Sequence, residues 1–165
     1  MSSARLRMVT GLLAVLASLP LLAGQRIESQ YFPGPNLELQ SRWLLSAPQR
    51  VRAEAALRNI MVAESAFTEL RLLVPSAWVG KRARIYLLVP GQVTGMSGLP
   101  GFEAEWRTQG VYLPGKSRPG DRVLFYEGTV PGTPLRDFVA YTFKVDARYS
   151  SGPVRFEPVY EIEEY

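Results

Sequence analysis

The sequence predicts an all-β fold, a single antiparallel β-sandwich of immunoglobulin-like or similar type with seven to nine strands. In several segments apolar and polar residues alternate with a period of two, the pattern of strands that bury one face against a core. Six Pro-Gly pairs punctuate these segments, and Pro followed by Gly suits the two central positions of a type II turn. A length of 165 residues fits one such domain.

Residues 1–24 are predicted to be a Sec-type signal peptide. Arg5 and Arg7 precede a largely apolar run over residues 8–23 that carries no charge, the order typical of such peptides. The alternative is an uncleaved membrane anchor, although the run is shorter than the about 20 residues of a spanning helix. Gln25 stands where a lipoprotein would carry its acylated Cys, so no lipidation is expected. Under both interpretations the remaining chain is exported, and we expect it to be periplasmic or secreted.

After this segment we expect an N-terminal extended segment over residues 25–36 and the β-sandwich domain over residues 37–165. The first strand is expected around Trp43, whose side chain falls on the apolar face of the alternation over residues 37–45. Trp106 falls on the apolar face of residues 102–107 in the same way. Both tryptophans are therefore expected in the core.

Residues 47–64 fit two interpretations. Ser46 to Gln49 has the form of a capping box with Pro48 in the first turn, which indicates a helix. Val51, Ala53 and Ala55 alternate with charged residues at strand period. Because the neighbouring segments are β, a strand is favoured here, and one short helix within residues 47–64 stays possible.

The remaining strands follow from clear alternation, which is seen over residues 68–74, 83–89, 102–107, 139–145 and 154–162. Residues 138–149 and 154–162 are expected to form a hairpin around the turn at residues 150–153. Pro158 cannot donate to a ladder, so the last strand is expected at an edge or with a bulge. The outward glutamates near the C-terminus would then prevent edge-to-edge association.

The composition excludes several kinds of chemistry, because the chain has no Cys and no His. Disulfides, thiolate or imidazole metal sites and a Ser-His-Asp triad are all excluded. Residues 25–165 hold 17 Lys and Arg against 15 Asp and Glu, a net charge of +2 without a basic stripe. Nucleic-acid binding is therefore not expected, and neither is any cofactor or catalytic residue.

Residues 110–117 match the P-loop pattern G-x-x-x-x-G-K-[ST] letter for letter. A P-loop needs a helix that begins at its lysine, so that backbone N–H groups face the phosphates. Pro119 and Gly120 would end such a helix at once. Nucleotide binding is therefore rejected.

The carboxylates give only weak support for a catalytic or metal-binding site. Glu103 and Glu105 have the separation that glycoside hydrolysis requires, but the alternation places both on the solvated face of a strand. Asp121, Asp137 and Asp146 stand near strand ends without a calcium-loop pattern, so no metal site is expected. A carboxylate-based hydrolase is the remote alternative for function.

The candidate ligand- or partner-binding residues are Trp78, which lies in the connection between two expected strands, and the neighbouring Lys81, Arg82 and Arg84. A loop Trp beside cations suits contact with a ligand or a lipid headgroup, and it equally suits a plug at the end of the sandwich. The irregular residues 90–101 are a second segment in which function or mobility is expected.

The leading hypothesis is an exported, non-catalytic β-sandwich that binds another protein in a cell-envelope or extracellular assembly. The first alternative is a carbohydrate- or small-ligand-binding module that uses Trp78. The partner is expected to be an envelope or secreted protein, with membrane contact only if the N-terminal segment is uncleaved.

Overall fold

A computed structural model describes residues 24–34, 38–98 and 100–165. Within them the chain is mostly antiparallel β-structure, with twelve strands and no long helix. No helix in this part of the chain is long and apolar enough to span a bilayer. The predicted signal peptide lies outside the described residues except for Gly24.

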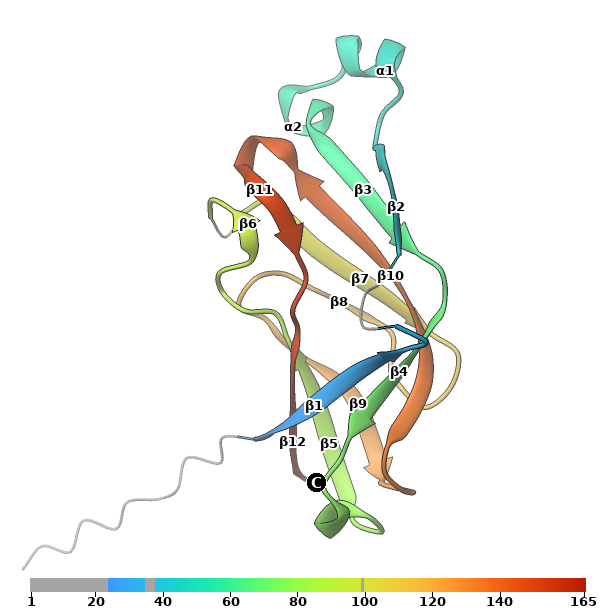
Figure 1. The fold of residues 1–165 in the computed structure, drawn as a ribbon. Coiled ribbons are helices and arrows are strands. Elements are labelled where there is room, and N and C mark those ends of the chain that lie inside the picture. Colours follow the sequence, from blue (N-terminus) through green and yellow to red (C-terminus); the bar gives the residue numbers. More distant parts are fainter. Residues whose placement is uncertain (1–23, 35–37, 99) are drawn as a thin grey trace, which may run out of the picture.

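Figure 1 labels the elements, and their bounds are as follows. The strands are β1 (Gln25–Phe32), β2 (Leu39–Trp43), β3 (Ile60–Ser65), β4 (Thr68–Leu73), β5 (Arg82–Leu88), β6 (Thr94–Met96), β7 (Phe102–Thr108), β8 (Gly115–Ser117), β9 (Arg122–Thr129), β10 (Leu135–Asp146), β11 (Ser150–Arg155) and β12 (Val159–Glu164). The helical segments are α1 (Ala47–Arg52), α2 (Ala55–Arg58) and the single 3-10 turns η1 (Ser76–Trp78) and η2 (Ala147–Tyr149).

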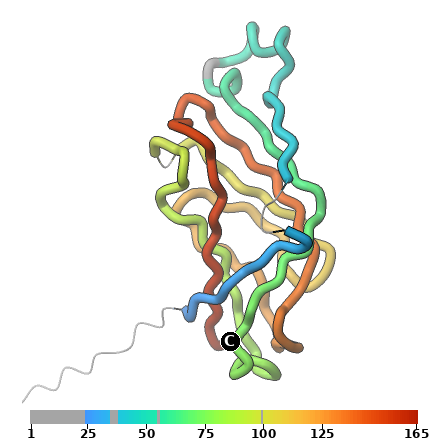
Figure 2. Tube along the Cα trace, in the orientation of Figure 1, coloured from blue at the N-terminus to red at the C-terminus, as the bar shows by residue number. Residues whose placement is uncertain are grey.

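Ten strands form one continuous sheet in the order β2-β3-β10-β4-β1-β12-β5-β9, with β7 paired to β10 and β8 paired to β7. Strands β6 and β11 form a separate two-stranded sheet. All these pairings are antiparallel. Figure 2 shows the first described residues, the C-terminus and the green loop before β5 at one end of the molecule.

Strand β1 joins the two sides of this sheet. Its residues Gln25 to Ile27 pair with β12, and Glu28 to Phe32 pair with β4. We call β12, β5 and β9 the β5 side, and β4, β10, β3, β2, β7 and β8 the β10 side. Residues 25–32 of the expected N-terminal extended segment thus form a strand that belongs to both sides.

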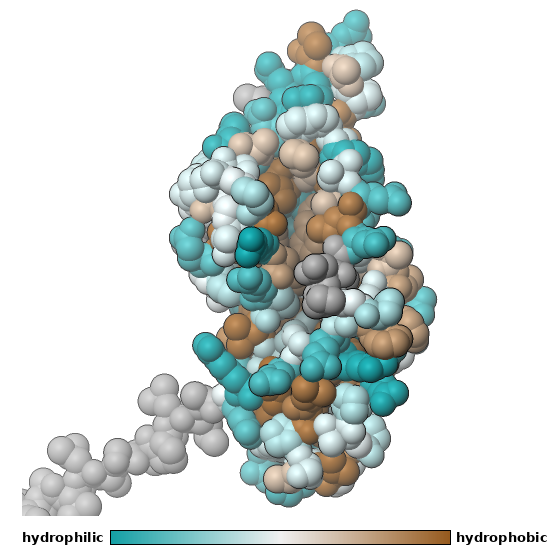
Figure 3. Space-filling view, in the orientation of Figure 1, coloured by the Kyte–Doolittle hydropathy of each residue, from teal (hydrophilic) through white to brown (hydrophobic). Residues whose placement is uncertain are grey.

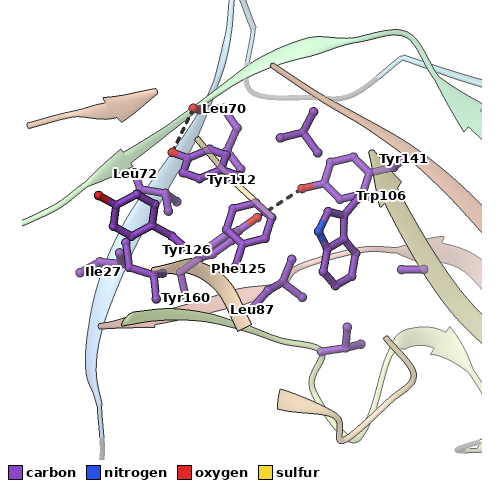
Figure 4. Close-up of a cluster of buried hydrophobic side chains, with 14 of the residues drawn as sticks. Ile27, Leu70, Leu72, Leu87, Trp106, Tyr112, Phe125, Tyr126, Tyr141 and Tyr160 are labelled. Carbon is purple, nitrogen blue, oxygen red and sulfur yellow. Dashed lines mark hydrogen bonds between the residues drawn. The ribbon is translucent and has the colours of Figure 1, made fainter. Parts of the chain in front are cut away.

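The core lies between these two sides. Trp106 of β7 and Tyr160 of β12 both pack on the Phe125 ring of β9, with ring centroids 5.9 Å and 5.3 Å from that of Phe125. Figure 4 shows these rings pointing toward one another together with Leu70, Leu87 and their neighbours. The prediction that Trp106 is buried is confirmed, since only 1% of the residue is exposed.

Two predictions about the strands were wrong. The expected count of seven to nine was too low, partly because β6 and β8 are only three residues long. The expected hairpin between residues 138–149 and 154–162 does not form, because β10 pairs with β3, β4 and β7 while β12 pairs with β1 and β5. Strand β12 therefore has neighbours on both edges, and Pro158 precedes it instead of interrupting it.

Residues 47–64 contain both helix and strand. The preference for a strand was wrong over residues 47–58, which are mainly helical. Two short helices replace the single helix that was left possible, and β3 begins at Ile60. The Gln49 side chain accepts hydrogen bonds from the backbone N–H and the hydroxyl of Ser46, at 3.0 Å and 2.8 Å. This confirms the capping box as the start of α1.

Candidate functional site

Trp78 lies at the end of the molecule where the described chain begins. Its indole Nε1 donates to the Gln25 side-chain oxygen at 3.1 Å, and its half-buried ring packs against the core. Lys81 Nζ lies 6.0 Å from the centroid of this ring. Trp78 thus packs at the end of the molecule. Such packing was the alternative to contact with a ligand in the sequence analysis.

The two arginines of the predicted site turn toward other partners. Arg82 and Arg84 both stack on the ring of the C-terminal Tyr165, with guanidinium carbons 3.8 Å and 4.3 Å from its centroid. Arg84 also forms an ion pair with Glu127 at 3.1 Å, and hydrogen bonding from Arg84 lowers the pKa of this glutamate. Tyr165 was missed by the sequence reasoning, because no short-range pattern connects it to residues as distant in sequence as Arg82 and Arg84.

Glu103 does not have the electrostatics of a general acid. Its carboxylate lies 3.2 Å from an Arg118 nitrogen and 3.3 Å from Lys144 Nζ. Partial burial raises the pKa of Glu103, but the hydrogen bonds from Lys144 and Arg118 outweigh this effect, so the pKa is lowered. A glycosidase acid requires a raised pKa. Glu105 is exposed on the same face of β7.

Of the three aspartates near strand ends, two accept hydrogen bonds from backbone N–H groups and one forms an ion pair. Asp121 accepts from the backbone N–H of Arg118 at 2.8 Å, and Asp137 accepts from that of Tyr112 at 2.7 Å. Asp146 pairs with Arg148 at 2.6 Å. Among the described residues no three carboxylates are grouped so that they could hold a metal ion.

The P-loop-like segment has a packing role. Its lysine lies in strand β8, and no helix follows. A side chain at Gly110 would place its Cβ 2.8 Å from an Asp137 carboxylate oxygen, and one at Gly115 would lie 2.8 Å from the Trp106 ring. Both glycines are therefore required by close neighbours.

A surface that the sequence did not single out is the arm, which we define as residues 39–58, comprising β2, α1 and α2. Figure 1 shows the arm at the end of the molecule opposite η1. All five residues of β2 are exposed, and within the described residues β2 pairs only with β3. Trp43 is 39% exposed, so its predicted place in the core was wrong.

The opposite edge of the sheet is covered, in contrast to β2. The backbone N–H of Leu113 donates to the carbonyl oxygen of Phe125 in β9 at 2.7 Å, so the segment before β8 lies along this edge. Exposed edge strands are templates for pairing with another chain, and proteins usually cover them. Of these two ends of the strand order, β2 is therefore the one without a second neighbouring segment among the described residues.

The arm is apolar and basic. It holds five of the exposed large hydrophobic side chains, which are Leu39, Trp43, Leu44, Val51 and Leu57. Its charged residues are four arginines and one glutamate. Beside it is a hollow of about 610 Å³, whose lining includes Leu44, Leu57 and Ile60. Figure 3 shows hydrophobic side chains at the tip of the arm and in a surface hollow below it.

Helix α1 buries no residue, so the core does not hold it in place. Side-chain contacts within the arm do so instead. Arg50 Nε donates to the carbonyl oxygen of Arg58 at 2.9 Å, and its guanidinium lies 4.0 Å from the centroid of the Trp43 ring. Arg58 Nε in turn donates to the carbonyl oxygen of Ala53 at 2.7 Å. The arginines thus satisfy carbonyls near the helix ends and keep Trp43 in place.

Comparison of the chain with protein-family models, with curated proteins and with solved structures gave no match.

Proposed function

We propose that the protein is an exported, non-catalytic binding module that takes up an extended segment of another cell-envelope or secreted protein along β2. The observation that carries the proposal is a sheet edge without a described neighbour whose five residues are all exposed. Addition of a partner strand to such an edge supplies main-chain hydrogen bonds, and alternate side chains supply specificity.

The side chains of the arm indicate the chemistry of this partner. Leu39 and Trp43 share one face of β2, because they are an even number of residues apart in the strand. A partner strand with apolar residues at alternate positions would extend this apolar face. Since the arm has four arginines against one glutamate, acidic residues flanking that strand would complement its charge.

We also propose that the β5 side and the β10 side are the two layers of an immunoglobulin-like β-sandwich, and that β1 passes from one layer to the other. The contact of the Trp106 ring of β7 with the Phe125 ring of β9 joins the two sides and supports a two-layer core. The carbohydrate-binding alternative has less support, because the Trp78 ring is half-buried and its N–H is engaged by Gln25.

The test compares two substitutions at side chains of equal exposure. Leu39 and Val111 are each 46% exposed, and Val111 lies outside the arm. We expect a specific protein to co-purify with the unmodified chain and with Val111→Glu. We expect at least about tenfold less of that protein with Leu39→Glu, which corresponds to a loss of about 1.4 kcal/mol or more of binding free energy.

Amide hydrogen exchange on the purified complex locates the contact. Residues 39–43 should become protected when the partner binds, because their outward N–H groups would then be hydrogen-bonded. Equal capture by both glutamate variants, or protection only outside the arm, would show that β2 is not the binding edge.

A further inference from the structure

Two loops form the end of the molecule opposite the arm, residues 75–81 and residues 129–134. They are hydrogen-bonded side by side, with the N–H of Gly80 donating to the Val130 oxygen and the N–H of Val130 donating to the Lys81 oxygen, each at 2.9 Å. Figure 1 shows this end, with η1, at the bottom of the view.

These loops carry almost no charge. Lys81 is their only charged residue, whereas 21% of the whole chain is charged. Val79 is 41% exposed at the tip of the first loop. A surface of a water-soluble domain is normally rich in charged side chains, so a loop pair with one cation indicates contact with something other than water.

The chain enters the fold at this end. Gln25 is the first residue of β1, and its side chain accepts the hydrogen bond from Trp78. Gly24 packs on β12, where a side chain would place its Cβ 3.0 Å from that of Glu161. Only this glycine separates residues 8–23, the uncharged and largely apolar run, from the sheet. If that run stays in a bilayer, the end formed by the two loops lies at the bilayer surface.

The side chains around the loops suit such a surface. Trp and Tyr gather where a membrane meets water, and Lys and Arg contact the headgroups. Trp78 and Tyr165 stand at this end with Lys81 and Arg82, and Arg82 stacks on the Tyr165 ring at 3.8 Å. Exposed Glu164 partly offsets these cations. Attraction to anionic lipid is thus reduced, and apolar contact together with the tether would dominate.

We propose that residues 8–23 remain in the membrane as an anchor and that residues 75–81 and 129–134 rest on the surface of that phospholipid bilayer. The domain then stands on the membrane with the arm directed away from it. This inference uses the uncleaved form of the N-terminal segment and does not depend on the partner proposed for β2.

The test uses single cysteines, which are unambiguous because the chain has none. Val79→Cys and Thr133→Cys place a nitrobenzoxadiazole fluorophore on each loop, and Val51→Cys places it on the arm, where Val51 is 79% exposed. The full chain is reconstituted in vesicles of phosphatidylethanolamine and phosphatidylglycerol, with and without nitroxide-labelled lipid.

We expect the labels at positions 79 and 133 to emit at shorter wavelength with severalfold higher intensity, and to be quenched by the nitroxide lipid. The label at position 51 should behave as in water. High salt should leave this difference intact, because it screens charge but not the apolar contact and the tether that hold this end on the bilayer. The proposal is overturned if the chain fails to float with the vesicles, if all three labels stay in water, or if position 51 is quenched as strongly as the loops.

Discussion

Three tyrosines form a buried chain of hydrogen bonds across the core. The Tyr31 hydroxyl donates to that of Tyr141 at 3.2 Å, and the hydroxyls of Tyr141 and Tyr160 are 3.3 Å apart. These residues come from β1, β10 and β12, so the chain of phenols connects both sides of the sheet. Burial raises the pKa of all three phenols well above the ordinary value.

Alkaline pH should therefore destabilise the fold. A raised pKa means that the folded state keeps protons that the unfolded state loses, so the free energy of unfolding is highest below about pH 10 and falls as pH rises above it. We expect Tyr141→Phe to remove one such group. Above pH 10 the free energy of unfolding should then fall less steeply with pH, by up to about 1.4 kcal/mol per pH unit. Urea unfolding between pH 8 and pH 11 measures it.

The control for this experiment is Phe143→Leu, next to Tyr141 in the core, where the two rings stack at 5.5 Å. It should lower the free energy of unfolding by a similar amount at every pH, because it removes packing without a titratable group. If Tyr141→Phe also left the slope unchanged, the buried phenols would not control alkaline stability.

At single residues, the sequence could show which side of a strand is apolar but not what covers it. Trp43 and Trp106 have the same alternation around them, yet only Trp106 faces the β5 side and is buried. The same limit applies to the acidic C-terminus. Glu161 and Glu163 both pair with Arg122 of β9, at 3.5 Å and 2.8 Å, which no short-range pattern could predict.

Among the elements, the arm is expected to unfold locally before the rest of the molecule. Its helices are short and α1 buries no side chain, so their stability depends on a few bonds from side chains to carbonyls. Arg58→Ala removes the bond to the Ala53 oxygen. We expect amide exchange over residues 47–58 to accelerate severalfold while the global unfolding midpoint stays unchanged.

Arg52→Ala is the matched control, because within the described residues the Arg52 side chain forms no hydrogen bond or ion pair. This variant should exchange like the unmodified chain. A drop in the global midpoint for Arg58→Ala would instead show that the arm is part of the cooperative core.

The elements also show where sequence reasoning ended. Strands β5, β7 and β10 were placed correctly because each buries one face and keeps the other polar. Val51 misled the assignment of residues 47–58, since its alternation with arginines resembles a strand although it is 79% exposed. Pairing partners were not predictable because β10 contacts strands that are distant in the sequence, not its neighbour β11.

For the whole molecule, β1 should make unfolding a single event. Ile27 is buried where β1 passes from β12 to β4. We expect Ile27→Ala to lower the free energy of unfolding by about 2–4 kcal/mol, with circular dichroism and tryptophan fluorescence changing at the same denaturant concentration. Arg26→Ala, at an exposed neighbouring position, should cost less than about 0.5 kcal/mol. Separate transitions for the two probes would mean that the two sides of the sheet unfold independently.

The pairing of β1 with β12 joins the first described strand to the last, and Gln25 lies opposite Ile162. Until residues 159–164 are available, β1 has nothing to pair with along Gln25 to Ile27, and the β5 side lacks the strand between β1 and β5. Contacts so distant in sequence form slowly, because a long loop must close first. A chain leaving the ribosome, or threading through a narrow channel with its N-terminal side first, would therefore keep this part of the sheet incomplete until residues 159–164 emerged.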